Sequence, residues 1–564
     1  MTTVNAPSPA IVAQHAVRRL PRAALWLLSL AYVLSGFVGR TAWKTDDLEA
    51  FGFIWQLASP LVGENASWLR PTLVGQADAH LALLPYWLGA IAVKALPWLS
   101  PELAARIPFV GLLLLTLICT WYAIYALARH PQAQPVAFAF GGEARPTDYA
   151  RALADGGLLA LIACLGLARL GHESTAALSQ LACASLVFFA LSNHTRHRLS
   201  ALLAMAVGML GLTLSGAPTM SLLLGLGGTA VLAAGTRAKA LDLGLMLLIA
   251  LMCVTLAGSL DLWRWRLQAD RGAELASWAK LLLWFTWPTW PLVLWSLWRW
   301  RHALRQPWRT PHLALPLWFA LVTIGATWLT GLSDRALLLS LPALAALAAF
   351  ALPTLNRGLS AFIDWFTLLF FTVCVLTIWV VWVAMQTGFP KQPAANVARL
   401  APGFEPSFSL IAFILAVIAT LCWVALVRWR VGRHRAALWK SMALPAGGAA
   451  LCWLLLMTLW LPLLDYARSY APLSRKLVAL VEPTQCVAYI GLSRAQITGL
   501  RLHAGYELAD YKRGQNRCPW LFMNSRVQSL AVTDELLTQW ELISSVQRPT
   551  DGNEWIAVFR RRNP

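Results

Sequence analysis

The stretch AALWLLSLAYVLSGFVGRTAWKTDD, residues 23–47, leads from an apolar run directly into two adjacent carboxylates, Asp46 and Asp47. Residues 23–39 carry no charge and have nearly the length that a helix needs to cross a bilayer. The stretch therefore predicts a membrane-spanning helix with an acid pair at the point where the chain leaves the bilayer.

The composition of the chain favours a membrane protein with many helices. Its 564 residues are 58% hydrophobic and 13% charged, whereas soluble domains carry about 25% charged residues. The net charge of +20 is also typical of nucleic-acid-binding proteins. Here, however, the basic residues cluster in short loops between apolar runs, where they orient a membrane protein. We expect an all-α polytopic protein embedded in the lipid bilayer, and no nucleic-acid partner.

Apolar runs of nearly bilayer-spanning length recur along the first 463 residues. Thirteen of them are predicted to cross the membrane: 23–39, 107–128, 152–170, 176–192, 199–214, 218–234, 240–260, 279–298, 313–331, 335–352, 361–384, 408–427 and 441–463. A further run, 82–99, contains Pro85 and Lys94 and is ambiguous. If it crossed, every later loop would change sides, and the positive-inside rule would be violated repeatedly. We therefore place 82–99 along the outer interface as an amphipathic or re-entrant helix.

The distribution of positive charge predicts the orientation of these spans. One set of loops includes TRHR (195–198), TRAK (236–239), RWRHALRQPWR (299–309) and RWRVGRHRAALWK (428–440). Loops on the other side, such as SGAPTM (215–220) and GLSD (331–334), are nearly free of Lys and Arg. Because cytoplasmic loops are rich in these residues, we expect a multi-pass protein of the bacterial inner membrane. Its N-terminus would be cytoplasmic and its C-terminus periplasmic.

The composition changes after the last apolar run. We expect a transmembrane domain over residues 1–463 and a small periplasmic α/β domain over 464–564. The runs CVAYIGL (486–492), PWLFMN (519–524) and EWIAVFR (554–560) predict strands, and TDELLTQWELISS (533–545) predicts a helix. Cys486 and Cys518 would lie in an oxidising compartment, where they can form a disulfide or remain free, since their spacing does not decide it.

The outer loop 40–106 gathers polar side chains at the membrane interface. They are the acids Asp46, Asp47, Glu49, Glu64 and Asp78, the imidazole of His80, and the cations Arg40, Lys44 and Arg70. A carboxylate there can take a proton from a hydroxyl or amine nucleophile, or hold a metal beside a phosphate. The acid pair also has a structural explanation, because Thr45 and Asp46 can cap a helix that begins with Leu48.

The order of motifs in this region resembles the GT-C membrane glycosyltransferases, in particular the 4-amino-4-deoxy-L-arabinose lipid A transferases and the protein O-mannosyltransferases. Those proteins carry a Trp-x-x-Asp-Glu-type acid pair after the first span. Trp-x-x-Pro-x-x-x-Gly, Tyr-Trp and Ala-Arg-(Leu/Ile)-Pro motifs follow. The matching residues here are Trp43, Asp46 and Asp47, then Trp68, Pro71 and Gly75, then Tyr86 and Trp87, and finally Ala105, Arg106, Ile107 and Pro108. The stretch SDRALLLSLPALAAL (333–347) is similar to the family's basic residue followed by a Leu-Leu-Pro-type helix.

The resemblance implies inverting transfer of a sugar from a polyprenyl-phosphate donor, such as undecaprenyl phosphate, without a nucleotide cofactor. The acceptor would be lipid A, another glycan or a protein at the periplasmic face. Asp46 would activate the acceptor as a base, and Asp47 would orient substrate or bind a metal.

The chain departs from the family at the donor phosphate site. Glu49 stands where the aminoarabinose transferases have an Arg, and His80, Leu81, Ala82 and Leu83 stand where they have Glu-Lys-Pro-Pro. The donor phosphate would then be met by other outer-face cations. The candidates are Arg40, Lys44, Arg70 and Arg335.

A divalent metal site is a further expectation from the resemblance. Asp78, His80, His172 and Glu173 are predicted on the same side of the membrane, and two carboxylates with two imidazoles suit zinc or manganese. The alternative is interfacial hydrogen bonding, since the four residues show no close ligand spacing.

Two other functions remain open at the level of sequence. A lipid or sugar transporter or flippase would place ionisable residues near mid-membrane, often in paired repeats, but the predicted spans carry almost no charge and show no repeat. A non-catalytic GT-C relative would account for the missing Lys and Arg. The chain has no P-loop, dinucleotide fingerprint, HExxH or GxSxG motif, which disfavours enzymes built on those plans.

Overall fold

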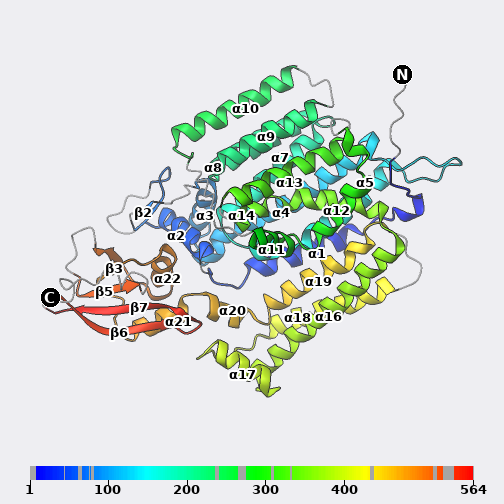
Figure 1. The fold of residues 1–564 in the computed structure, drawn as a ribbon. Coiled ribbons are helices and arrows are strands. Elements are labelled where there is room, and N and C mark those ends of the chain that lie inside the picture. The colour runs from blue at the N-terminus through cyan, green and yellow to red at the C-terminus, as the bar shows by residue number, and fades with distance from the viewer. Residues whose placement is uncertain are drawn as a thin grey trace.

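The structure is a computed structural model, and the chain divides into a large helical part and a smaller part with a β-sheet (Figure 1). It describes residues 8–43, 45–60, 67–74, 76–77, 82–234, 240–263, 275–306, 310–330, 333–431, 437–511, 518–524 and 539–562. Residues 8–21 lie at the end of the helical part remote from the sheet, and the last described residues belong to the sheet (Figure 1).

Helices occur in all thirteen runs that were predicted to cross the membrane. They are α1 (Arg22–Phe37), α4 (Pro101–Ala128), α5 (Pro146–Ile162), α6 (Leu165–Leu170), α7 (Ala176–Asn193), α8 (Arg198–Leu214), α9 (Pro218–Ala233), α10 (Ala240–Ser259), α11 (Leu275–Phe285), α12 (Thr289–Arg299), α13 (Pro311–Leu329), α14 (Asp334–Leu338), α15 (Leu341–Ala351), α16 (Arg357–Thr387), α18 (Leu410–Val431), α19 (Lys440–Leu456) and α20 (Leu461–Arg468). A shorter helix, α17 (Lys391–Leu400), follows α16. The prediction of a multi-span helical protein is confirmed.

The number of crossings is smaller when judged by helix length and composition alone. In the described parts of the chain six helices are long and apolar enough to span a membrane, or seven if the bent pair α19–α20 is one span. Five further apolar helices have only 10–17 residues. The count of thirteen spans therefore stays a prediction.

Several predicted spans are interrupted rather than continuous. The run 279–298 is divided into α11 and α12, and the run 335–352 into α14 and α15. The α19 and α20 axes meet at 69°. Pro288, Pro342 and Pro462 lie at or just beyond these breaks, and proline disfavours helical backbone in the residue before it.

The run 82–99 forms a short helix, α3 (Leu84–Ala95), that packs on α2 (Asp46–Ala58) and α4. Its 12 residues extend about 18 Å at 1.5 Å per residue, which is too short for a hydrocarbon core of about 30 Å. A Cβ atom added at Gly89 would lie only 2.6 Å from Cδ1 of Ile54, so α3 and α2 approach closely at this glycine. The geometry of α3 agrees with the predicted position along the interface.

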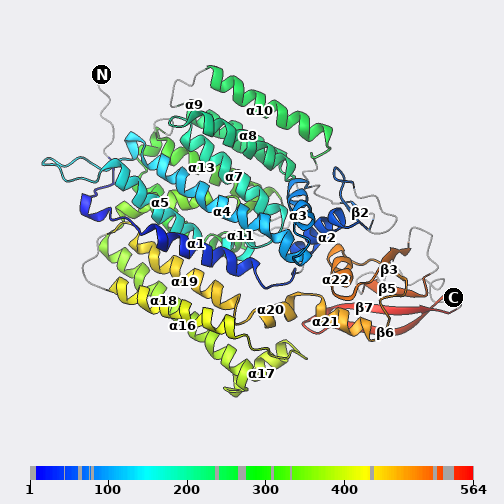
Figure 2. The same cartoon turned by 180° about the vertical axis from the view of Figure 1, so that it is seen from behind.

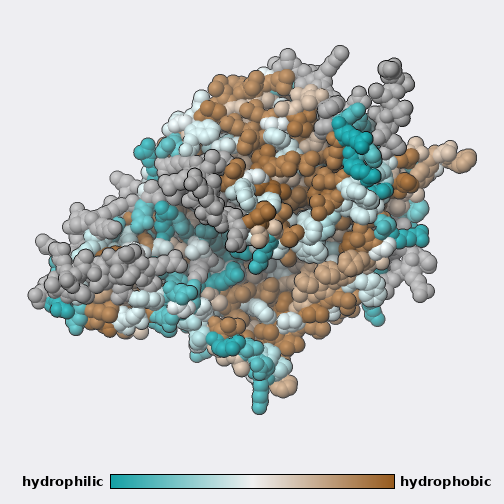
Figure 3. Space-filling view, in the orientation of Figure 1, coloured by the Kyte–Doolittle hydropathy of each residue, from teal (hydrophilic) through white to brown (hydrophobic). Residues whose placement is uncertain are grey.

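The core of the helical part is built around α15, in which every residue is buried. It packs against α5, α12 and α13, and its many alanines allow close approach of neighbouring helices. The outer surface of the helical part carries broad hydrophobic areas (Figure 3). Large apolar side chains such as Leu247, Leu369 and Leu421 are about 60% exposed there, as expected for helices that face lipid.

The C-terminal part contains a mixed five-stranded sheet in the order β4-β3-β5-β7-β6. Its strands are β3 (Val487–Ile490), β4 (Leu508–Asp510), β5 (Trp520–Asn524), β6 (Trp540–Arg548) and β7 (Asp551–Arg561). The strand β3 is parallel to β4 and β5, whereas β7 is antiparallel to β5 and β6. Two helices, α21 (Ala471–Val478) and α22 (Arg494–Ala504), complete this part, and a two-stranded ribbon, β1 (Thr72–Leu73) and β2 (Gln76–Ala77), lies in the first outer loop.

The helix predicted over 533–545 was wrong for its second half. Residues 540–545 belong to β6, which pairs with β7 in a long antiparallel hairpin, and residues 533–538 lie outside the described residues. In the hairpin, the backbone N–H and C=O groups of β6 and β7 pair with one another. This tertiary pairing overrides the weak helical preference of the segment. The three strands that the sequence predicted correspond to β3, β5 and β7.

The structure joins Cys486 and Cys518 in a disulfide, with their Cα atoms 4.9 Å apart. The two cysteines directly precede β3 and β5, and Val487 pairs with Trp520 in the parallel register of these strands. The strand register therefore brings together two residues that the sequence alone could not pair.

Candidate active site

The acid pair lies at the start of α2, in its first turn, between the helical part and the sheet (Figure 1). Among the described residues, the Thr45 side chain caps no backbone amide of this helix. Negative charge is favourable at a helix N-terminus, but Asp46 and Asp47 both have more specific partners. The capping explanation alone does not account for the pair.

Asp47 is the buried member of the pair. Its Oδ2 atom lies 3.0 Å from Nη2 of Arg40 and 3.9 Å from Nη2 of Arg106. The backbone amide of Ser174 donates to its Oδ1 atom at 2.8 Å. The side chains of Asp47, Arg40 and Arg106 are each at most 4% exposed. These contacts with two guanidinium groups and a backbone amide anchor the start of α2.

The segment before α2 is fixed by groups from distant parts of the chain. The amide of Ala42 donates to Glu102 in α4 at 2.9 Å, and the Trp43 indole donates to Asp465 in α20 at 2.6 Å. Arg106 donates to the carbonyl oxygen of Arg40. These bonds link the exit of α1 to α4 and α20, so the acid pair has a defined position relative to the membrane helices.

Asp46 is the accessible member of the pair. Its carboxylate forms an ion pair with Arg335 at the start of α14, and the two side chains are 41% and 36% exposed. The neighbouring Asp334 lies 3.7 Å from Arg169, whose side chain is 57% exposed. A solvent-accessible carboxylate is therefore set among cations contributed by α6 and α14.

Glu173 lies close to this group, in the connection between α6 and α7. Burial, together with the nearby negative charge of Asp47, raises the pKa of its carboxyl to about 8. Arg468 in α20 is within electrostatic reach of Glu173 and Arg169. At neutral pH Glu173 is therefore mostly protonated and can donate a hydrogen bond.

His172 serves packing between helices. Its Nε2 atom lies 3.0 Å from the carbonyl oxygen of Tyr32, and its Nδ1 atom lies 3.3 Å from that of Ala168. Its ring centroid is 4.5 Å from that of Trp453. Burial lowers the pKa of the imidazole to about 3, so His172 is neutral. A neutral imidazole carries one N–H, so His172 can donate to only one of these two carbonyls, and both of its ring nitrogens face backbone oxygens.

The predicted metal site is not assembled by the residues that can be tested. Among the described residues no group of three or more His, Cys, Asp or Glu side chains could hold a metal ion. His172 is engaged as above, whereas Asp78 and His80 lie outside the described residues. The metal site therefore stays a prediction, and no step below uses a metal ion.

The four cations predicted to meet the donor phosphate have different surroundings. Arg335 forms an ion pair with Asp46, and Arg70 is exposed in the first outer loop. Arg40 is buried with Asp47 and is not open to a ligand. Lys44 lies outside the described residues. The sequence did not predict Arg169 and Arg468 as residues of the site. The signal that could have found them is a cation at the end of an apolar run, because such a cation lies at the membrane interface.

Glu49, which stands where the related transferases have an Arg, contacts the C-terminal part of the chain. Its Oε1 atom lies 2.6 Å from Nη1 of Arg494 in α22. About two turns further along α2, Arg501 donates to the Gln56 side chain at 2.6 Å and lies 4.5 Å from the Trp55 ring centroid. The face of α2 that would otherwise carry a phosphate-binding Arg is used here to hold α22.

The solved structures provide a comparison over nearly the whole chain. ArnT from Cupriavidus metallidurans bound to undecaprenyl phosphate superposes with a TM-score of 0.63 at 14% identity, covering 96% of this chain and 99% of ArnT. The chain has an ArnT-like fold. The apo state of the same ArnT gives a TM-score of 0.61 at 14% identity, covering 95% of this chain and 98% of ArnT. No model of a protein family and no curated protein sequence matches the chain.

The comparison agrees with the resemblance read from the motifs in residues 40–110. ArnT is a lipid A aminoarabinose transferase of the GT-C class, and its fold here includes the C-terminal sheet as well as the membrane helices, since 99% of ArnT is matched. At 14% identity the match establishes the fold, not the substrate.

Proposed function

We propose that this protein transfers a sugar from a polyprenyl-phosphate donor to an acceptor at the periplasmic face of the bacterial inner membrane. The observation that carries the proposal is the accessible Asp46 carboxylate in contact with Arg335, whose chain neighbour Asp334 lies 3.7 Å from Arg169. The ArnT structure with the same fold holds undecaprenyl phosphate, a polyprenyl phosphate. The C-terminal sheet would then lie on the periplasmic side.

Asp46 is assigned as the base that activates the acceptor. Its carboxylate takes the proton from an acceptor hydroxyl or amine as that group attacks the anomeric carbon of the sugar. The bond from this carbon to the donor phosphate breaks on the opposite face, so configuration is inverted. Asp47 does not face the reactants, because its carboxylate is buried against Arg40 and Arg106. Its role is to position α2.

The leaving phosphate is assigned to Arg169, Arg335 and Arg468. Arg335 contacts Asp46, and Arg169 contacts Asp334. Arg468 lies near Arg169. Cations already in place stabilise the negative charge that develops on the leaving group. Protonated Glu173 adds a hydrogen-bond donor. This cluster takes over the role of the Lys and Arg that the related transferases carry and this chain lacks.

The proposal is tested by comparative mass spectrometry of lipid A, envelope glycans and periplasmic proteins. Four strains are compared: the deletion, the deletion restored with wild type, and the deletion restored with Asp46→Asn or Glu405→Gln. Glu405 is an exposed acid between α17 and α18 that takes no part in the contacts described for the site, and it serves as the matched control.

A sugar-sized mass that requires wild type or Glu405→Gln, and is lost with Asp46→Asn, would support the transferase and identify the acceptor as lipid A, another glycan or a protein. The same mass in the Asp46→Asn strain would remove Asp46 from the mechanism. No difference among the strains would overturn the proposed activity.

A further inference from the structure

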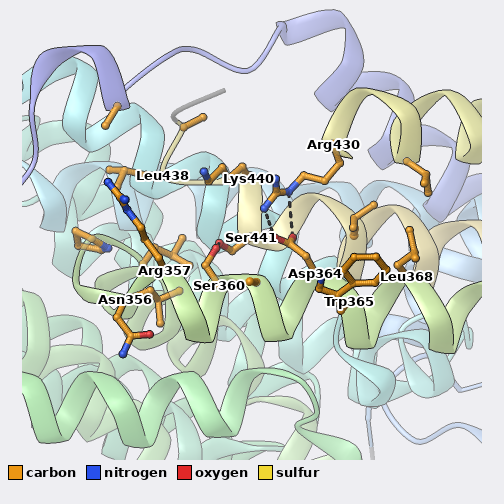
Figure 4. A pocket seen from close by; sticks show the side chains of 18 of the residues that line it. Asn356, Arg357, Ser360, Asp364, Trp365, Leu368, Arg430, Leu438, Lys440 and Ser441 are labelled. Carbon is orange, nitrogen blue, oxygen red and sulfur yellow. Dashed lines mark hydrogen bonds and ion pairs between the residues drawn. The ribbon is translucent and has the colours of Figure 1, made fainter. Parts of the chain in front are cut away.

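A second polar pocket lies at the other end of the helical part, remote from the C-terminal sheet (Figures 1 and 4). It has a volume of about 700 Å³ and is enclosed by the start of α16, the end of α18 and the start of α19, with Ile11 and Ala16 from the N-terminal segment. The candidate active site lies at the first turn of α2, beside the sheet, so the two sites are separate (Figure 2).

The pocket has an excess of positive charge. Its charged lining residues are Arg357, Arg430, Lys440 and Asp364. The Nε atom of Arg430 donates to Oδ1 of Asp364 at 3.0 Å, and these two side chains point toward each other in Figure 4. Lys440 is in electrostatic contact with Arg357, Arg430 and Asp364. Among the described lining residues three cations thus stand beside one carboxylate, and this excess of positive charge attracts an anion.

Helix termini and hydroxyl groups add to this attraction. Two helices begin at the pocket, α16 with Arg357 and α19 with Lys440, and the positive ends of helix dipoles favour anions. Ser360 and Ser441 also line the pocket, with their Oγ atoms 2.8 Å apart. Guanidinium, ammonium and hydroxyl donors around one space are typical of phosphate recognition.

The pocket continues into an apolar surface that faces lipid. Trp365, Leu368 and Leu444 line its other side, and Trp365 is 66% exposed. On the same outer face of α16, Phe362 and Leu369 are 64% and 60% exposed. A free phosphate ion would use only the polar half, whereas a phospholipid would use both, with its headgroup among the cations and its acyl chains along α16.

We propose that this pocket binds the phosphate headgroup of an anionic phospholipid in the membrane leaflet remote from the C-terminal sheet. Basic pockets between membrane helices recognise such headgroups, and each Lys or Arg near an anionic headgroup contributes about a fivefold gain in binding, or about 1 kcal/mol. The inference does not depend on the proposed transferase activity, because the pocket contains no residue of the candidate active site.

The test measures lipid retention by the full-length protein. Wild type is reconstituted in phosphatidylcholine nanodiscs with a minor fraction of phosphatidylglycerol, released, and analysed by native mass spectrometry. Arg357→Gln is compared first, since Arg357 is exposed and its loss leaves the Arg430–Asp364 pair intact. The double variant Arg357→Gln/Lys440→Gln follows. The matched control is Arg428→Gln, an exposed arginine at the same end of α18 that does not line the pocket.

We expect retained phosphatidylglycerol to fall about fivefold in Arg357→Gln and more than tenfold in the double variant, with wild-type retention in Arg428→Gln. An equal loss of retained phosphatidylglycerol in Arg428→Gln would mean that surface charge alone holds the lipid. That result would overturn the proposal that the pocket binds it. Binding of inorganic phosphate by wild type that retains no phosphatidylglycerol would show an anion site without a lipid and would overturn the lipid occupant. Unchanged retention in the double variant, with thermal stability like that of wild type, would overturn the proposal outright.

Discussion

The Oδ2 atom of Asp47 lies 3.0 Å from Nη2 of Arg40, and both side chains are almost completely buried. Adjacent to this pair, Asp46 is 41% exposed and contacts Arg335. Two neighbouring acids thus have opposite environments. The buried acid holds the structure together, and the accessible acid is available for chemistry.

Asp47→Ala should destabilise the protein far more than Asp46→Ala. Removing Asp47 takes away the carboxylate that both buried guanidinium groups contact, which costs about 3–5 kcal/mol, whereas an exposed ion pair such as Asp46–Arg335 contributes about 0–1 kcal/mol. Thermal unfolding of the purified protein in detergent, followed by tryptophan fluorescence, measures both effects. Equal shifts in the two variants would contradict the division of roles.

Arg335→Gln and Arg468→Gln should each weaken binding of undecaprenyl phosphate by about tenfold, since a charge-assisted hydrogen bond contributes about 1.5–3 kcal/mol. Titration of the purified protein with undecaprenyl phosphate, followed by native mass spectrometry, gives the affinities. Arg399→Gln on α17 is the control, because this exposed arginine is remote from the cluster. Affinities that match the control in both variants would remove these cations from the phosphate site.

Glu173→Gln should flatten the pH dependence of stability. The folded protein holds the Glu173 proton up to a pKa of about 8, against 4.5 for an ordinary glutamate. The folded state therefore binds more protons than the unfolded state between these values, and stability falls as pH rises through this window. The melting temperature is measured across it for wild type and Glu173→Gln. Parallel curves for the two proteins would mean that Glu173 titrates normally.

Glu49→Arg should loosen the contact between α2 and α22 by placing two guanidinium groups together. The ion pair is partly exposed, so we expect a loss of about 0.5–1 kcal/mol. Glu49→Arg/Arg494→Glu should recover most of it, because the reversed pair attracts again. A double-mutant cycle of thermal stability gives the coupling energy. Additive effects of the two substitutions would contradict a direct interaction between them.

Reduction of the disulfide should destabilise the C-terminal part. Cys486 and Cys518 are 32 residues apart in sequence, and closing a loop of that length is worth about 3–4 kcal/mol by chain entropy. Limited proteolysis with and without reductant, compared with Cys486→Ser/Cys518→Ser, checks this. A variant that resists proteolysis as well as the oxidised wild type would show that the sheet does not need the bond.

The sequence by itself determined where the membrane helices lie. An apolar run long enough to cross a bilayer can be read from the local sequence, and inside a bilayer such a run must satisfy its backbone hydrogen bonds as a helix. The same is true of the acid pair at the end of the first span and of the strands β3, β5 and β7. The motifs around Asp46 also predicted the ArnT-like fold that the comparison found.

Only the tertiary structure decided which charges meet. Arg335 reaches Asp46, Arg494 reaches Glu49 and Arg106 reaches Asp47 because helices far apart in sequence pack side by side. Residues 540–545 became a strand because β7 supplied the backbone partners. Such pairings depend on long-range packing that no local pattern encodes. The sequence could therefore place Asp46 and Asp47 together, but only the fold could bury one of them and leave the other open.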